Sequence, residues 1–194
     1  MSTDDKDRWD RKYSEAPEKW ETPDPFLLSA YSQFLSDTKP GAALDVGGGA
    51  GRHAIWLAQK GWQVRLLDVS GVAAGLVRKK AGQRADEMTG SVSTETVDLN
   101  TITSFGVEQY ELIVVFFFLR RELFPALIQA LKLGGTLIYK TYTLDQAMLR
   151  GGPADASYLL QPNELRQAFS ALHILHHQQS VQEKATAELV ARRT

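Results

Sequence analysis

The sequence predicts an α/β fold in which helices cover a mainly parallel β-sheet. Three observations support this prediction. Short apolar runs alternate with longer mixed segments along the 194 residues, which is the order expected for successive strand–helix units. One of these runs leads straight into a cluster of glycines and then into a helix-forming segment. Another run, residues 112–118, is almost wholly apolar, as expected for a strand that is buried on both faces.

The composition excludes several classes of protein. Hydrophobic residues make up 43% of the chain, charged residues 23%, and the net charge is −1, which is typical neither of a disordered chain nor of a nucleic-acid binder. The absence of cysteine excludes disulfides, zinc–thiolate sites and cysteine nucleophiles. The first residues lack the apolar core of a signal peptide, and every apolar run is far shorter than the roughly 20 residues of a membrane span. We therefore expect a cytoplasmic protein without nucleic-acid or membrane partners, and the oligomeric state is left open.

The elements of the N-terminal half follow from periodicity and from helix boundary signals. Trp9 and Tyr13 share one face of the first helix, because residues four apart are neighbours on a helix. Gly61 is a stop signal for the third helix, and Ser70 is a suitable cap for the fourth. The predicted helices cover residues 5–14, 26–35, 52–60 and 70–87, and the predicted strands cover 41–46, 63–67 and 91–97.

The C-terminal half continues the same alternation. After the apolar strand 112–118, we expect a helix over 121–131, a turn at Gly134-Gly135 and a strand over 136–142. Residues 144–161 form a predicted loop that is long enough to suggest a function. A short helix capped by Asn163 follows, and the segments 171–178 and 185–192 are predicted to close the chain as a pair of strands.

The sharpest motif is "LDVGGGAGRHA", in which a strand ends, glycines turn the chain and a helix begins. Glycines accept positive φ and allow a ligand close to the backbone, and the helix start offers unpaired N–H donors. The motif lacks the Lys-Ser/Thr of a phosphate-binding P-loop, and Arg52 stands where a dinucleotide fingerprint needs its third glycine. The spacing that fits is G-x-G-x-G, formed by Gly47, Gly49 and Gly51.

Two acidic residues end the next two predicted strands. Asp68 can accept hydrogen bonds from ribose hydroxyls, and Asp98 can accept one from an adenine amino group. Each residue could alternatively serve as a helix cap or turn former. Because ligands of open α/β sheets bind beyond the carboxyl ends of the strands, three such features at successive strand ends favour one nucleoside site.

These segments resemble class I S-adenosylmethionine-dependent methyltransferases. "LDVGGGAG" resembles their first motif, "VRLLDVS" their acidic loop, "VDLN" their adenine loop and "LKLGGTLIYKTY" the segment after their fourth strand. "WDRKYSEAP" and "YLLQPNELRQAF" resemble the tellurite-resistance-type branch of small bacterial methyltransferases. The resemblance implies a three-layer αβα Rossmann-like fold, with a seven-stranded, mostly parallel sheet and an antiparallel C-terminal strand.

The resemblance also implies how the chain is organised. One domain would span residues 1–194, with a helical cap over 1–37, a cofactor-binding core over 41–143, and a substrate loop, helix and strand pair over 144–194. The cofactor would be S-adenosylmethionine and its product S-adenosylhomocysteine. The implied cofactor-binding residues are Tyr13, Asp45, Gly47, Gly49, Gly51, Arg52, Asp68, Val69, Asp98, Leu99, Val115 and Phe116.

We expect the acceptor to be a small molecule, with a thiol or a chalcogen oxyanion as candidates. A soft nucleophile of this kind needs no strong base for in-line displacement, so no catalytic residue is assigned. His53 is expected on a helix surface, and His173 and His177 lack a nearby carboxylate in sequence, so no metal site is expected. The candidate substrate residues are Arg120, Arg121, Tyr142, Arg150 and Tyr158.

Two other functions stay open. The apolar Phe116-Phe117-Phe118 leaves few polar groups near the expected methyl group, as in a protein that binds the cofactor without catalysis or serves as an interaction module. A nucleotide-dependent oxidoreductase is the second alternative. The missing third glycine and the presence of Asp98 argue against it.

Overall fold

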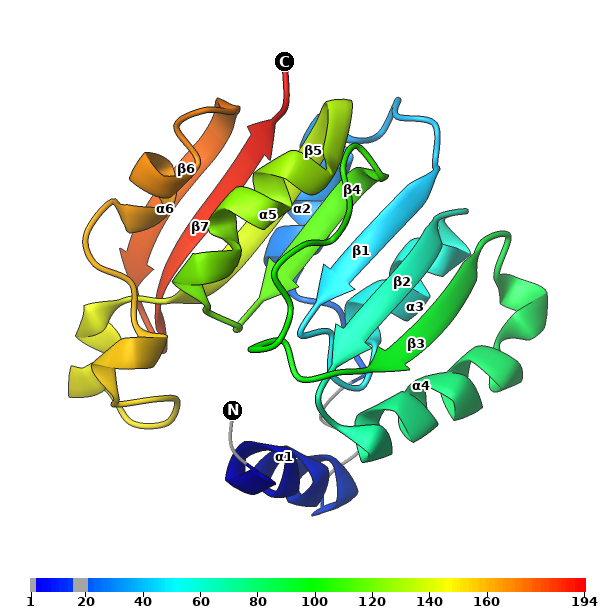
Figure 1. Ribbon diagram of the computed structural model, residues 1–194, viewed down its shortest axis with the longest axis horizontal. Helices are drawn as coiled ribbons and strands as arrows, with labels where there is room; N and C mark the ends of the chain where they lie inside the picture. Colours follow the sequence, from blue (N-terminus) through cyan, green and yellow to red (C-terminus); the bar gives the residue numbers. More distant parts are fainter. Residues whose placement is uncertain (1–2, 16–20) are drawn as a thin grey trace. The chain divides into compact units, whose positions relative to one another are not determined.

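The computed structural model describes residues 3–15 and 21–194, and the chain forms two compact units, Met1–Ile102 and Thr103–Thr194 (Figure 1). Within the described ranges, none of the helices is both long and apolar enough to cross a membrane. The expectation that residues 1–194 make one domain stays a prediction.

The first unit contains three parallel strands in the order β3-β2-β1 (Figure 1). Val46 lies opposite Leu67, and Asp68 lies opposite Thr96, so the three carboxyl ends meet at one edge. The predicted elements are confirmed here to within a few residues. They are α1 (Thr3–Glu15), α2 (Pro25–Phe34), β1 (Ala42–Val46), α3 (Arg52–Gln59), β2 (Gln63–Asp68), α4 (Gly71–Gln83), the 3₁₀ turn η2 (Ala85–Glu87) and β3 (Ser91–Thr96).

The second unit contains four strands in the order β4-β5-β7-β6 (Figure 1). β4 and β5 are parallel, whereas β7 runs antiparallel to both β5 and β6, which confirms the predicted C-terminal strand pair. Its elements are β4 (Tyr110–Phe116), η3 (Arg121–Leu123), α5 (Phe124–Ala130), β5 (Leu131–Tyr142), η4 (Leu144–Met148), η5 (Ala156–Tyr158), α6 (Glu164–Ala168), β6 (His173–Val181) and β7 (Ala185–Arg192).

Each unit has its own apolar core. In the first unit, Trp62 is fully buried and its indole N–H donates to the Tyr31 hydroxyl at 3.2 Å. In the second unit, residues 112–115 of β4 are completely buried, as the apolar run predicts. Phe124, Tyr139 and Phe169 pack together there, with ring centroids 5.1–6.0 Å apart. The strands that carry the candidate site residues are therefore held by close packing on both sides.

The predicted turn at Gly134-Gly135 is wrong, because these glycines form an irregularity inside β5. Gly134 has φ 80°, and the register of β5 against β4 shifts between Tyr110 and Leu112. A Cβ on Gly135 would lie 2.9 Å from the carbonyl oxygen of Tyr110, so only glycine allows this approach of the two strands. As a result, β5 begins at Leu131, where the sequence predicted the end of a helix.

Two further local predictions have opposite outcomes. The Ser70 side chain accepts a hydrogen bond from the Ala73 amide, so the predicted cap of α4 is confirmed. The predicted Asn163 cap is wrong: within the described part of the chain its side chain makes no capping bond. Asn163 has φ 60° instead of the extended conformation from which a side chain reaches the first amides of a helix.

Candidate functional site

The edge formed by the carboxyl ends of β1, β2 and β3 gathers the predicted cofactor residues of the first unit. β1 carries Asp45 and runs into the glycine loop, and β2 ends at Asp68. The amides of Gly47 and Gly48 donate to the Leu67 carbonyl at 2.9 and 3.2 Å, which fixes the glycine loop beside the end of β2. The Val97 amide donates to the Asp68 carbonyl at 2.8 Å, which brings the segment leading to Asp98 to the same edge.

The glycines of the loop are required by conformation and by space. Gly47, Gly49 and Gly51 have φ values of 67°, 53° and 77°, in the left-handed region that favours glycine. A Cβ on Gly49 would lie 2.2 Å from the Tyr13 hydroxyl oxygen, and one on Gly51 would lie 2.6 Å from Val77. Gly51 also precedes α3, whose first turn has no side-chain cap from any described residue. The helix therefore presents backbone N–H groups to a ligand.

Asp68 organises the site through both of its carboxylate oxygens. Oδ2 accepts from the Gly49 amide at 2.9 Å, and Oδ1 accepts from the Ser70 amide at 2.9 Å. Burial raises the pKa of Asp68. The hydrogen bonds from the Ser70 and Gly49 amides, and from the amide of the half-buried Val69, lower the pKa and only partly offset this rise. A carboxylate has about four acceptor positions, so Asp68 can still accept a hydrogen bond from a hydroxyl group of a ligand.

Asp45 is a buried carboxylate without a hydrogen-bond partner in the described part of the chain. Its side chain is 1% exposed, and neither oxygen has a hydrogen-bond partner among residues 3–15 and 21–194. Burial, reinforced by the charge of Asp68, raises the pKa of Asp45 to about 7. The positive charge of Arg52 and the nearby Ala54 amide, which does not form a full hydrogen bond, only partly oppose this rise. An ionised carboxylate in such a place calls for a cation or strong hydrogen-bond donors, which a ligand can bring.

Asp98 is already engaged in its own turn. Its Oδ1 accepts from the backbone amide and from the side-chain amide of Asn100, both at 2.9 Å. These contacts fit the turn-forming role that the sequence left open, and the contact with an adenine stays a prediction. Leu99 is 3% exposed and anchors the turn.

Tyr13, one of the predicted cofactor-binding residues, lies against the glycine loop. The side chain is 6% exposed and packs with Ala50 and Ala73. Its ring stacks on Trp9 with centroids 5.6 Å apart. The helix α1 therefore contributes an aromatic pair to this edge of the first unit.

In the second unit, an aromatic and cationic cluster follows β4. Val115 and Phe116, predicted to contact the cofactor, end this strand and are buried. Phe117 has φ 57°, so β4 ends one residue before it, at Phe116, and the predicted strand over 112–118 is too long at its end. Its ring lies 5.0 Å from that of Tyr142, and the ammonium groups of Lys140 and Lys184 lie 6.0 and 5.0 Å from its centroid.

Sequence reasoning missed both lysines. Lys140 lies two residues before Tyr142, so it could have been found from the alternation of side chains along β5. Nothing local to Lys184 indicates its place, because the β6–β7 hairpin brings it to Phe117.

The other candidate substrate residues are scattered through the second unit. Arg121 binds Glu164 through two nitrogens, at 2.6 and 2.9 Å, and donates to the carbonyls of Ser157 and Leu159 at 3.2 and 2.8 Å. These contacts give Arg121 a structural role in fixing the segment around η5, which includes the half-buried Tyr158. Arg120 lies 3.5 Å from Glu122, and Arg150 is exposed. Their contacts with a substrate stay predictions.

The histidines have structural surroundings. His53 is 3% exposed, and its Nε2 accepts from the Asp24 amide at 3.2 Å, so the expected helix-surface position is wrong. The start of α2 packs over this side chain, which the local sequence does not indicate. On β6, a register irregularity between Ile174 and His176 interrupts the strict alternation of side chains. Over the described ranges, no group of three His, Asp or Glu side chains is placed to hold a metal ion.

Comparison with known proteins supports one family. The sequence matches the family described as "Tellurite resistance protein TehB" over residues 8–191. A 35-residue segment is 54% identical to the ribosomal RNA small subunit methyltransferase C of Alcanivorax borkumensis. That segment is 18% of this chain and spans only 11% of the length of that relative.

Solved structures share the fold. TehB from Haemophilus influenzae matches with a TM-score of 0.70 and 18% identity, over 97% of this chain and 67% of that one. Magnesium protoporphyrin IX methyltransferase from Synechocystis PCC 6803, with bound SAH, matches with a TM-score of 0.73 and 18% identity, over 99% of both chains. These matches confirm the predicted fold class, a Rossmann-like methyltransferase fold with a mostly parallel seven-stranded sheet and an antiparallel C-terminal strand.

Replacing Asp45 by Asn should stabilise the ligand-free protein at pH 8 and have little effect at pH 5. The pKa of Asp45 is raised, so folding favours its protonated form, and this stability is lost as the pH rises from about 4 to about 7. The amide of Asn keeps the shape of the side chain and carries no charge. Urea unfolding of both proteins across this range measures the difference, with the exposed Asp37→Asn variant as control. A pH-independent difference between wild type and Asp45→Asn would contradict the assignment.

Replacing Arg121 by Met should lower the free energy of unfolding by about 1–2 kcal/mol, because a partly exposed charged pair and two carbonyl contacts are lost. The matched control is Arg150→Met, whose exposed side chain should leave stability unchanged. Chemical denaturation compares the two variants. Equal stabilities would contradict the structural role of Arg121.

Proposed function

The chain belongs to the family of the tellurite resistance protein TehB. We propose that it transfers the methyl group of S-adenosylmethionine to a small-molecule acceptor by in-line displacement. The family and the fold support an S-adenosylmethionine-dependent methyltransferase. We further propose that the acceptor is a thiol or a chalcogen oxyanion.

The observation that carries this proposal is the pair of buried carboxylates beside the glycine loop. S-adenosylmethionine brings two cationic groups, its sulfonium and its α-ammonium, whereas a dinucleotide brings an anionic pyrophosphate. The oxygens of Asp45, which accept no hydrogen bond from the described residues, favour the cationic ligand, and Asp68 adds a second negative group. The same charges would repel a pyrophosphate. This argues against a nucleotide-dependent oxidoreductase.

We assign each residue of the edge a role that its position supports. Asp45 pairs with the α-ammonium, and Asp68 accepts from a ribose hydroxyl with its remaining acceptor position. The uncapped start of α3 donates to the carboxylate of the methionine part. The turn of Asp98 and Leu99 contacts the adenine. When bound, S-adenosylmethionine supplies a methyl group on a sulfur that leaves with its electron pair.

The second unit supports an anionic or soft acceptor. Lys184 places positive charge beside Phe117, directly after the carboxyl end of β4, and Tyr142 adds a phenol beside the same ring. Lys140, on the same ring, is paired with Glu188 at 3.0 Å. Ligands of open α/β sheets bind at such strand ends. The protein's main contribution to a thiolate or oxyanion is then alignment, which can supply about 7–11 kcal/mol of the barrier without a general base.

The alternative of a non-catalytic binding protein is favoured by one observation. Phe116 is buried and apolar, and the aromatic ring of Phe117 follows it, so β4 ends without a polar catalytic group. Turnover separates the two functions. A binding protein would bind S-adenosylmethionine and leave every acceptor unmethylated.

Cofactor binding should depend on Asp45 and on pH. We expect S-adenosylhomocysteine, which retains the α-ammonium, to bind more weakly as the pH falls below about 7, because protonated Asp45 cannot pair with a cation. Asp45→Asn should weaken binding about tenfold at pH 8 and remove this pH dependence, and Asp68→Ala should weaken binding at every pH. Calorimetric titration measures all three, with Asp37→Asn as control. Absence of binding to the wild type would overturn the proposed function.

Methylation should be detectable with small acceptors and should depend on Lys184. We expect Lys184→Gln to raise the KM for an anionic acceptor severalfold and to leave the affinity for S-adenosylhomocysteine unchanged, because the charge is lost beside Phe117. A screen with thiols, selenite and tellurite, read by release of S-adenosylhomocysteine, tests this. Lys79→Gln, an exposed change in the first unit, is the control. Binding of the cofactor with no acceptor methylated would support the non-catalytic alternative.

A further inference from the structure

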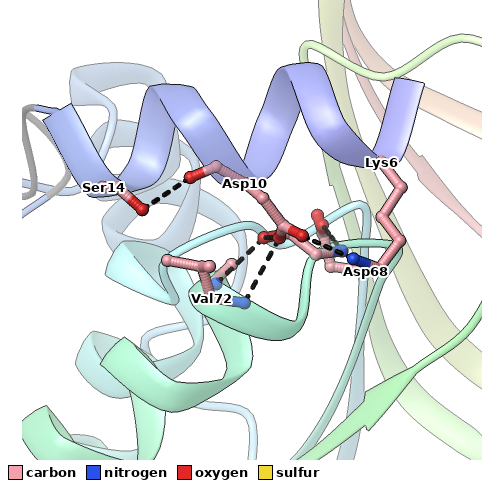
Figure 2. Close-up of polar contacts among 7 residues, drawn as sticks. Lys6, Asp10, Ser14, Asp68 and Val72 are labelled. Atoms are coloured by element: carbon pink, nitrogen blue, oxygen red, sulfur yellow. Dashed lines mark hydrogen bonds and ion pairs between the residues drawn. The ribbon is translucent and has the colours of Figure 1, made fainter. Parts of the chain in front are cut away.

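Asp10 makes contacts that the proposed chemistry does not use. It lies on α1, and its Oδ1 accepts from the Ser70 hydroxyl at 2.5 Å and from the Val72 amide at 3.3 Å (Figure 2). Its Oδ2 accepts from Lys6 at 2.6 Å. A carboxylate from one helix thus binds the first turn of another, where backbone N–H groups and the helix dipole favour a negative charge.

Ser70 connects this contact to the cofactor site. The Ser70 oxygen accepts from the Ala73 amide at 3.0 Å, which leaves its proton to point at Asp10. The Ser70 amide donates to Oδ1 of Asp68. One residue therefore holds α1 with its hydroxyl and the proposed ribose ligand with its amide.

Tyr13 makes the second contact of α1 with the same edge. It follows Asp10 by three residues, so both side chains lie on one face of the helix. The Tyr13 hydroxyl occupies the space beside Gly49, whose amide donates to the other oxygen of Asp68. The two contacts of α1 therefore meet the two partners of Asp68, at Ser70 and at Gly49.

The docking of α1 depends on few interactions. Among its side chains that the structure describes, Tyr13 alone is buried, and Trp9 and Tyr13 make apolar contacts with a small cluster around Ala50 and Ala73. A helix of 13 residues is marginal by itself in water. Burial opposes the ionised form of Asp10, yet the hydrogen bonds from Lys6, Ser70 and Val72 lower its pKa, so this carboxylate is held in its charged state.

We propose that Asp10 is a positioning residue that holds α1 against the start of α4 and so keeps Tyr13 over the glycine loop. When Asp10 releases Ser70 and Val72, α1 moves away and the cofactor site opens. This rests on the proposed binding of the cofactor at Asp45 and Asp68. The residue acts through Tyr13 and touches no reacting atom. Its effect should therefore appear in the rates of cofactor exchange more than in the chemistry.

The first test compares Asp10→Ala with Asp7→Ala, an exposed acidic residue on the same helix. Alanine is the better helix former in both variants, and this gain offsets the loss of the weak Lys6–Asp10 pair within α1. Stopped-flow displacement of S-adenosylhomocysteine should show its dissociation rate at least tenfold faster in Asp10→Ala, with an association rate that is unchanged or faster. Asp7→Ala should match the wild type. A dissociation rate within twofold of the wild type, or a slower association rate, would overturn the proposal.

A double mutant tests whether Asp10 acts through Tyr13. If it does, Asp10→Ala combined with Tyr13→Ala should dissociate no faster than Tyr13→Ala alone, whereas independent effects would multiply and contradict the proposal.

Hydrogen exchange on the ligand-free protein gives a readout that does not need the cofactor. The amides of residues 8–15 should lose protection in Asp10→Ala and keep it in Asp7→Ala, while α4 stays protected in both. Unchanged protection of α1 would overturn the proposal even if the cofactor binds. Absence of cofactor binding with the expected loss of protection would overturn only the proposed function.

Discussion

The parallel register of β1, β2 and β3 is the constraint on which the rest of the site depends. It sets Val46 beside Leu67 and Asp68 beside Thr96, so that each strand ends at the same edge. The glycine loop then has the Leu67 carbonyl as its acceptor, and the segment after β3 has that of Asp68. A shift by one residue would turn each strand's side chains to the opposite face and remove the acidic residues from this edge.

This arrangement places negative charge where the fold by itself does not need it. Asp45 is fully buried, and the described residues give its oxygens no hydrogen-bond partner, a combination that costs stability once the group is ionised. Functional sites commonly retain such groups, because the ligand supplies the missing partner. The proposed cofactor site is also connected with α1. Tyr13 lies beside Gly49, and Asp10 binds Ser70. The amides of Gly49 and Ser70 both donate to Asp68.

In the second unit, some charged side chains are bound within the protein and others are available to a substrate. Arg121 is committed to Glu164 and to two carbonyls, so its charge serves the packing of the segment around η5. Lys184 is exposed beside Phe117, whose positive φ turns the chain sharply after β4. An acceptor at this strand end would therefore meet the Lys184 ammonium and the Phe117 ring, whereas the Arg121 guanidinium is already committed.

The sequence by itself determined the alternation of strands and helices, the glycine loop with its positive φ, and the placing of Asp45 and Asp68 at strand ends. These features depend on backbone conformation and on periodicity within a few residues. Only the tertiary structure decided the partners of long side chains. Arg121 meets Glu164 across 43 residues, and Asp10 meets Ser70 across 60. No local pattern encodes such pairs, because they exist only after separate elements have packed against one another.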